Sequence, residues 1–232
     1  MKKLFFNPNI GEFDITDPKT IFLIIENPKS FWKFGQYLYD KLPDHIGYCS
    51  LLIDGKEKAV DEVSLFIANP YDLDINSKSN LNALYKMLKK EYFNDLSEGI
   101  DEISKKIEKI CESIRLDFDA EIEMSGQLKI DDLFKVGNMR FVDDCETILE
   151  KLTKFISISN ELQGIDVVFI NQLSSFLDVE ELKSFSKELH YRGITLVNVE
   201  SNQILLEKHK GIEAEKLIID SDLCSISGQS II

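Results

Sequence analysis

The chain has 232 residues, of which 44% are hydrophobic and 29% charged, a composition typical of a folded globular protein rather than a disordered tail. Its 27 basic residues against 41 acidic ones give a formal net charge of −14. This excess of acid argues against a nucleic-acid partner, unless basic residues are concentrated locally.

The cysteines exclude two common classes of site. Cys49, Cys111, Cys145 and Cys224 lie far apart, and the chain has only three histidines, so the spacing of neither a zinc finger nor a thioredoxin motif is present. We expect buried thiols in a reducing compartment. Because no run of 18 apolar residues occurs, the sequence predicts a soluble, cytoplasmic protein without a membrane partner.

The first third of the chain has the pattern of an α/β protein. A continuous apolar run over 20–25 predicts a buried strand, and Asn27 and Pro28 then supply a helix cap and first turn. The turn Asp54-Gly55-Lys56 predicts a hairpin between 48–53 and 59–63. A further strand is expected over 63–68.

The middle third is helical. Leu81, Leu84, Leu88 and Tyr92 lie on one face of a first helix. A second, longer helix repeats apolar residues at intervals of four and three, the seam of a helix that packs against another: Leu96, Ile100, Ile103, Ile107, Ile110 and Ile114. A third helix is predicted over 142–156.

The last third returns to strands and helices. We expect a strand over 165–170, a helix that begins at Asp178 with Glu181 as its capping partner, and a strand over 194–199. Strands separated by helices favour parallel pairing. The sequence thus predicts an α/β sheet domain from 1–78 and 161–232, with an inserted helical lobe over 79–160.

This arrangement is typical of nucleotide hydrolases, but their phosphate-binding loop is absent. Only Gly55-Lys56 offers a glycine before lysine, and Glu57 follows in place of serine or threonine. The strand at 167–170 ends in the neutral pair Asn171-Gln172, where such enzymes place acids. No Gly-x-Ser-x-Gly motif occurs, and the histidines share no motif. We therefore expect no enzyme activity.

The segment 117–124 alternates acidic and apolar residues. In an extended conformation, Asp117, Asp119, Glu121 and Glu123 would share one face. Such carboxylates suit Ca²⁺, and further acids follow that complete a coordination shell: Asp131, Asp132, Asp143 and Asp144. The alternative is an edge strand with a solvated acidic face.

Two clusters of lysines also stand out. Lys105, Lys106 and Lys109 share the side of the long helix opposite its isoleucines, and Lys86, Lys89 and Lys90 do the same on the helix before. Either cluster suits phosphate groups. The alternative is a solubilising face paired with Glu102, Glu108 and Glu112.

The order of these features resembles a known family. The strand and aromatic helix over 20–42, the segment 72–77 that opens the lobe, and 167–171 followed by 176–181 are similar to the Csn-two family, the ring-forming spacer-acquisition accessory proteins of type II-A CRISPR-Cas systems. The resemblance extends over nearly the whole chain, to a closing strand at 216–220.

The resemblance implies a non-enzymatic homotetramer in adaptive antiviral defence. It implies a ring that takes double-stranded DNA by its ends, beside the CRISPR integrase and the effector nuclease, and a degenerate P-loop nucleotide-hydrolase fold. It places Ca²⁺ at the acidic row, with Asp131 and Asp132 as further ligands, and DNA at lysines such as those named above. The competing hypothesis is a protein-interaction scaffold of the same fold that does not contact DNA.

Overall fold

The computed structural model describes residues 1–6, 11–40, 49–58, 60–116, 128–204, 211–222 and 225–231. The chain divides into two compact units: a sheet unit, Met1–Ile75 with Asp144–Ile232, and a helical unit, Asn76–Asp143. In the described part of the chain no helix is both long and apolar enough to cross a membrane.

The sheet unit is built on a six-stranded sheet in the order β10-β9-β3-β8-β7-β6. Five neighbouring strands are parallel, as predicted, and β10 pairs antiparallel with β9. Every residue of β3 and β8 is buried, as expected for parallel strands covered on both faces. The strands are β3 (Thr20–Ile25), β6 (Ser64–Ile67), β7 (Val167–Asn171), β8 (Thr195–Glu200), β9 (Glu213–Ile219) and β10 (Ser225–Ile231).

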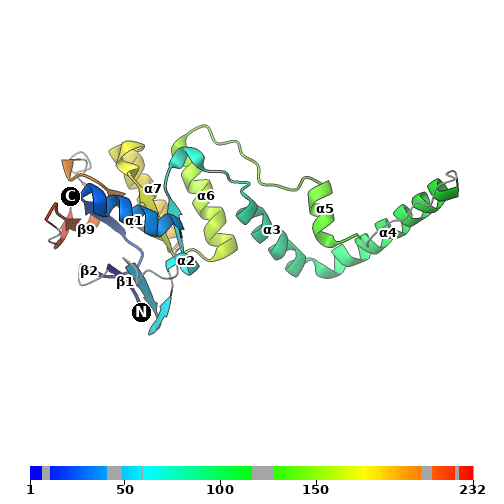
Figure 1. The fold of residues 1–232 in the computed structure, drawn as a ribbon, viewed down its shortest axis with the longest axis horizontal. Helices are drawn as coiled ribbons and strands as arrows, with labels where there is room; N and C mark the ends of the chain where they lie inside the picture. The colour runs from blue at the N-terminus through cyan, green and yellow to red at the C-terminus, as the bar shows by residue number, and fades with distance from the viewer. Residues whose placement is uncertain are drawn as a thin grey trace. The chain divides into compact units, whose positions relative to one another are not determined.

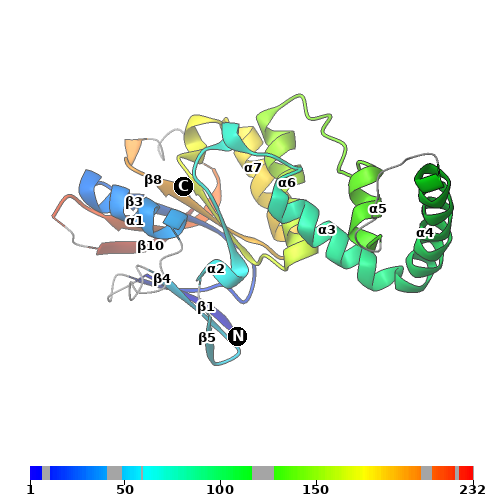
Figure 2. The ribbon, with the colours of Figure 1, turned by 45° about the vertical axis from the view of Figure 1, so that its right-hand side comes forward.

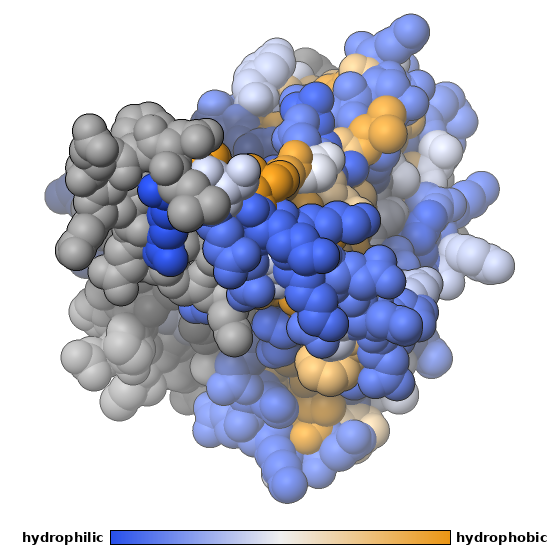
Figure 3. Space-filling view, turned by 90° about the vertical axis from the view of Figure 1, so that its right-hand side faces the viewer, coloured by the Kyte–Doolittle hydropathy of each residue, from blue (hydrophilic) through white to orange (hydrophobic). Residues whose placement is uncertain are grey.

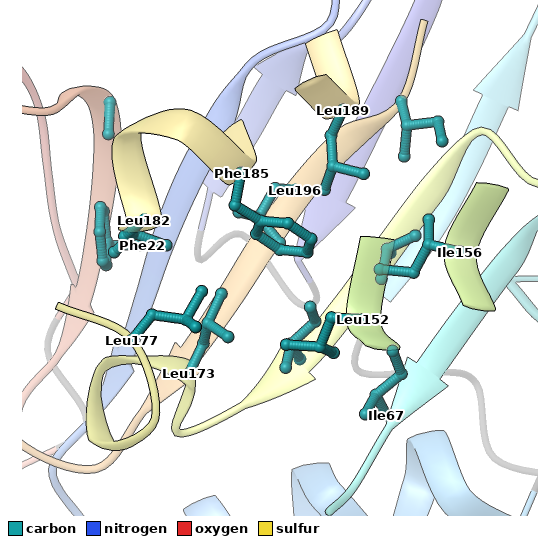
Figure 4. Packing of buried hydrophobic residues seen from close by; sticks show 14 of the residues in the cluster. Phe22, Ile67, Leu152, Ile156, Leu173, Leu177, Leu182, Phe185, Leu189 and Leu196 are labelled. Atoms are coloured by element: carbon teal, nitrogen blue, oxygen red, sulfur yellow. The ribbon is translucent and has the colours of Figure 1, made fainter. Parts of the chain in front are cut away.

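Alternate residues of β3 enter two different cores. Phe22 and Ile24 pack with side chains of α6 (Ile148–Gln163) and α7 (Val179–Tyr191), the core shown in Figure 4. Ile21, Leu23 and Ile25 pack with Phe34 and Leu38 of α1 (Pro28–Asp40) on the other face. Figures 1 and 2 show α1 covering a different face of the sheet from α6 and α7.

Local capping explains where the helices begin. Asn27 accepts hydrogen bonds from the backbone N–H groups of Lys29 and Ser30 at the start of α1. Asp178 and Glu181 form the capping box predicted for α7. The prediction for α6 was wrong in its bounds, because Thr147 and Glu150 form a second capping box that starts this helix at Ile148.

Helix α6 also belongs to a different unit from the one the sequence suggested. The expected lobe over 79–160 included it, whereas the helical unit of the structure ends at Asp143. The reason is that Leu152 and Ile156 are fully buried in the core beneath the large sheet. Two 3₁₀ turns, Pro70–Asp72 (η1) and Leu173–Ser175 (η2), lie in the same unit.

A second, antiparallel sheet in the order β2-β1-β4-β5 lies in the sheet unit: β1 (Lys2–Phe6), β2 (Gly11–Asp14), β4 (Cys49–Ile53) and β5 (Lys56–Lys58). The hairpin turn at Asp54-Gly55 is confirmed, with φ of 50° and 77°. Its second arm was predicted wrongly, because β5 ends at Lys58 and Val60–Val63 forms a short helix, α2.

The helical unit holds α3 (Lys78–Glu91), α4 (Phe93–Leu116) and α5 (Ile130–Val136). Its core is small: Ile100, Ile130 and Phe134 are buried, and the ring of Tyr85 stacks on Phe134 at 5.1 Å. The predicted isoleucine seam packs against another helix at its start, where Ile100 is buried, and three of its later residues are exposed. The exposed fractions are 37% for Ile103, 59% for Ile110 and 43% for Ile114.

Candidate nucleic-acid interface

The first lysine cluster lies at the carboxyl end of α3. Lys86 and Lys90 are exposed, and neither forms an ion pair with a residue in the described ranges. Lys89 differs, because its Nζ lies 3.4 Å from Oδ1 of Asp131 on α5. The intervals of three and four residues put all three lysines on one side of the helix. Two of the three ammonium groups are therefore available to an anionic ligand.

The second cluster lies on α4. Lys105, Lys106 and Lys109 are all exposed. Within the described parts of the chain they form no ion pair, including with the nearby Glu102, Glu108 and Glu112 that the alternative interpretation required. Figure 3 shows a face of the molecule on which hydrophilic residues predominate among those coloured by hydropathy.

Charge is distributed unevenly along α4. Residues 93–104 contain four acids and no bases, whereas 105–116 contain four bases and two acids. Acids at the amino end and bases at the carboxyl end both complement the helix dipole, so this pattern also stabilises the helix itself. Its consequence for binding is a basic second half on a helix of an acidic protein.

The helical unit carries little of the protein's negative charge. Residues 76–143 contain 11 bases and 14 acids, a net charge of −3 out of −14 for the whole chain. Four of those acids belong to the row over 117–123. The surface that bears the two lysine clusters is thus the part of the molecule that repels a polyanion least.

The predicted calcium ligands are only partly within the described structure. Asp117, Asp119, Glu121 and Glu123 lie outside the described residues. Asp132 accepts the backbone N–H of Lys129 at 3.1 Å, which lowers the pKa of its carboxyl group, and Asp131 faces Lys89. No group of three or more metal-ligating side chains is present where the structure describes the chain. Asp131 and Asp132 alone do not make a cation site.

Amide side chains lie at the carboxyl ends of the parallel strands, the edge at which open α/β sheets generally bind ligands. After the central strand β3, the N–H groups of Lys29 and Ser30 point to Oδ1 of Asn27 at 3.1 and 3.2 Å, so these donors are occupied. Gly55-Lys56 lies instead in the hairpin turn of the small sheet. Because the phosphate-loop motif is defined by its glycines, the sequence did not mark the Lys29-Ser30 pair at this position.

The end of β7, two strands from β3 in the sheet, also carries amides. Asn171 donates a hydrogen bond to the carbonyl of Ala68, and Gln172 donates to the hydroxyl of Ser201. Gln172 has φ of 52°, a left-handed conformation. Both amide nitrogens are therefore engaged in holding loops at this edge.

One buried acid at this edge was not predicted. Glu200, the last residue of β8, is 0% exposed. Its Oε1 accepts the backbone N–H of Ser174 at 3.0 Å, while Oε2 has no hydrogen-bond partner among the described residues. Burial raises the pKa of this carboxyl group. The one signal in the sequence was that Glu200 directly follows the apolar run 194–199, which predicts a buried strand.

Fold and site together define a two-unit α/β protein with lysine-bearing helices inserted into a mainly parallel sheet unit. Residues 49–223 match the family model described as CRISPR-associated protein (Cas_Csn2). The match covers well over half of the chain, and the protein belongs to this family of type II-A CRISPR accessory proteins.

Other comparisons add little. No curated protein matches the sequence. A solved structure titled "Structure of a bacterial Atm1-family ABC exporter with ATP bound" aligns at 11% identity and a TM-score of 0.45, covering 98% of this chain. This chain spans only 39% of the exporter's length. At that score the likeness does not identify the fold.

Proposed function

We propose that this protein is a non-enzymatic, calcium-dependent, ring-shaped homotetramer that binds the ends of double-stranded DNA during CRISPR spacer acquisition, beside the integrase and the effector nuclease. The observation that carries the proposal is a set of exposed lysines on α3 and α4, none of which forms an ion pair with a described residue: Lys86, Lys90, Lys105, Lys106 and Lys109. Family membership supplies the CRISPR context.

The lysines support DNA binding without sequence preference. An ammonium group is a compact charge that binds phosphate oxygens and carries no information about the bases. Because the whole chain is acidic, attraction requires several lysines to act together. Several subunits around one duplex would supply such a concentration, and each phosphate contact would contribute about −0.9 to the slope of log K against log salt.

The amides at this sheet edge support the absence of catalysis. We infer that the sheet unit is a degenerate form of the P-loop nucleotide-hydrolase fold, in which helix α1 follows the central strand β3 as the phosphate loop's helix does in those enzymes. Asn27 takes the N–H donors that would hold phosphate, and Asn171 and Gln172 replace the acids that would hold magnesium. ATP turnover above that of a Lys29→Ala control would contradict this inference.

Calcium is assigned to the acidic row of Asp117, Asp119, Glu121 and Glu123. The argument is chemical: four carboxylates at alternate positions repel one another unless a hard cation joins them. Asp131 and Asp132 would serve at most as additional ligands, because each already has a partner within the helical unit.

The proposal is tested by comparing a covalently closed plasmid with the same plasmid cut once, at equal calcium and salt. A ring admits DNA only at an end, so we expect binding of the cut form only, with affinity falling by several orders of magnitude between 50 and 200 mM salt for roughly eight phosphate contacts. Equal affinity for both forms would refute threading. Binding of neither form would favour a protein scaffold that does not touch DNA.

Matched variants locate the DNA-binding surface. Replacing Lys105, Lys106 and Lys109 by alanine should make the salt dependence less steep, by about 0.9 for each phosphate that a subunit no longer neutralises. Replacing Lys56, Lys58 and Lys187 in the sheet unit removes the same charge and should leave the slope unchanged. If both variants weaken binding equally, net charge rather than a lysine surface governs the affinity.

A further inference from the structure

The outer face of α1 exposes the chain's single tryptophan. Trp32 is 63% exposed and Tyr39 is 71% exposed. Lys29, Lys33 and Gln36 on the same helix are also exposed. Large aromatic rings in water are unfavourable for folding alone, so a helix face that retains two of them suggests a binding role.

Helix geometry places these five side chains together. At about 100° per residue, positions 29, 32, 33, 36 and 39 fall within an arc of about 120°. Trp32 and Tyr39 are seven residues apart, two turns or about 10 Å along the axis, with Lys33 and Gln36 between them. The result is an aromatic–basic stripe, consisting of Lys29, Trp32, Lys33, Gln36 and Tyr39.

The opposite face of α1 holds the helix in the fold without help from the stripe. Phe34 is 3% exposed and Leu38 is 7% exposed in the core against the large sheet. The hydroxyl of Tyr37 donates to the carbonyl of Cys49 at 3.0 Å. Substitutions on the aromatic–basic stripe should therefore leave the fold intact.

The charge of the stripe selects an anionic ligand. Neither Lys29 nor Lys33 forms an ion pair within the part of the chain that the structure describes, and the one acid of α1 is its last residue, Asp40. Residues 28–39 therefore carry a charge of +2 in a protein with a net charge of −14. Aromatic rings interleaved with lysines favour a single nucleic-acid strand over an acidic peptide, because exposed bases stack on the rings while phosphates meet the ammonium groups.

We propose that the aromatic–basic stripe of α1 binds an unpaired nucleic-acid strand without sequence preference. Bases stack on Trp32 and Tyr39, Lys33 contacts a phosphate between the two bases, and Lys29 contacts a phosphate beyond Trp32. This site lies in the sheet unit and requires neither calcium nor the lysines of α3 and α4. It goes beyond the proposed binding of duplex ends by giving the protein a contact for strands that are no longer paired.

Because Trp32 is the chain's single tryptophan, its fluorescence reports on this site alone. We expect saturable quenching on addition of a short oligothymidylate without calcium, with a slope of about −1.4 in log K against log salt for two phosphate contacts on a single strand. Acrylamide should quench the Trp32 fluorescence of the free protein, and bound oligonucleotide should protect Trp32 from this quenching. No quenching by oligothymidylate, or a tryptophan already shielded from acrylamide, would overturn the proposal.

Matched variants complete the test, and their binding is measured by the fluorescence anisotropy of a labelled oligothymidylate. Trp32→Ala should weaken binding roughly 5- to 150-fold, and Tyr191→Ala, which removes a ring that is 90% exposed on α7, should not. The alanine variant of Lys105, Lys106 and Lys109 should bind the oligonucleotide normally, even if duplex binding fails. Failure of that variant to bind the oligonucleotide, or equal quenching by polyglutamate of matched charge, would refute a site for unpaired strands on α1.

Discussion

The buried carboxyl group of Glu200 predicts a measurable dependence of stability on pH. It lies at the end of β8 with 0% exposure, and its Oε1 accepts the backbone N–H of Ser174 at 3.0 Å. Burial disfavours the charged form more than hydrogen bonding favours it, so the pKa is raised above the ordinary glutamate value of 4.5. Glu200→Gln removes the titration while keeping the side chain's shape and an acceptor for Ser174.

The direction of the change in unfolding free energy with pH follows from proton binding. Above pH 4.5 the unfolded chain loses the Glu200 proton while the folded protein retains it, so the folded state binds more protons. The free energy of unfolding of the wild type therefore falls with rising pH, by up to about 1.4 kcal/mol per pH unit, until the pH passes the folded-state pKa. This contribution is fully present below pH 4.5 and lost above the folded-state pKa.

The assay is urea denaturation of wild type and Glu200→Gln at a series of pH values from the glutamate pKa upward. The difference in unfolding free energy isolates Glu200, because every other group titrates in both proteins. We expect the variant to gain stability relative to wild type as the pH rises, and then to reach a plateau. Glu57→Gln, at an exposed position of β5, is the matched control. A difference that does not change with pH would refute the reasoning.

Three further predictions concern packing, the helical unit and calcium. Leu152→Ala should lower the unfolding free energy by about 2–5 kcal/mol and the Tm measured by calorimetry, because a buried side chain leaves a cavity beneath the large sheet. Asn76→Ala should cost about 1–3 kcal/mol and speed hydrogen exchange near Phe141, whose backbone N–H and C=O pair with the Asn76 amide at 2.8 and 3.1 Å. Calcium at one hundred times its Kd should stabilise the wild type by about 2.7 kcal/mol. A calcium chelator should therefore lower the Tm of the wild type but not that of the Asp119→Ala, Glu121→Ala variant.

The parallel sheet and its helices could be predicted because local signals and burial agree there. The run Thr20–Ile25 was predicted with its bounds, and Asp178 with Glu181 fixed the start of α7. The prediction errors occur where a stronger local signal or a contact distant in the sequence determines the bounds or the pairing of an element. Thr147 starts α6 later than the apolar pattern indicated, and β1 lies in a sheet set by its pairing with β4, a strand distant in the sequence.

The candidate site could be predicted only in part. Periodicity located the lysine faces of α3 and α4, and the structure adds that all but Lys89 lack an ion pair with described residues. The sequence could not indicate that Trp32 is exposed. The pattern that places Phe34 and Leu38 in the core predicts the inner face of α1, but it does not say whether another element covers the outer face. Nor could composition reveal Glu200, whose burial depends on η2 covering the end of β8.

The two proposed nucleic-acid surfaces follow from the same distribution of charge. At the sheet edge, Asn27 accepts hydrogen bonds from two amino-terminal N–H groups of α1. Among the lysines without an ion pair to a described residue, Lys29 and Lys33 lie beside the exposed rings of Trp32 and Tyr39. Lys105, Lys106 and Lys109 lie on α4, where residues 94–116 include no aromatic ring, whereas the exposed rings of Tyr92 and Phe93 follow the α3 cluster. Rings favour exposed bases, whereas lysines alone favour a duplex whose bases are stacked inside. Competition between unlabelled duplex and oligothymidylate should therefore be weak, and mutual displacement at stoichiometric concentrations would show that one surface binds both.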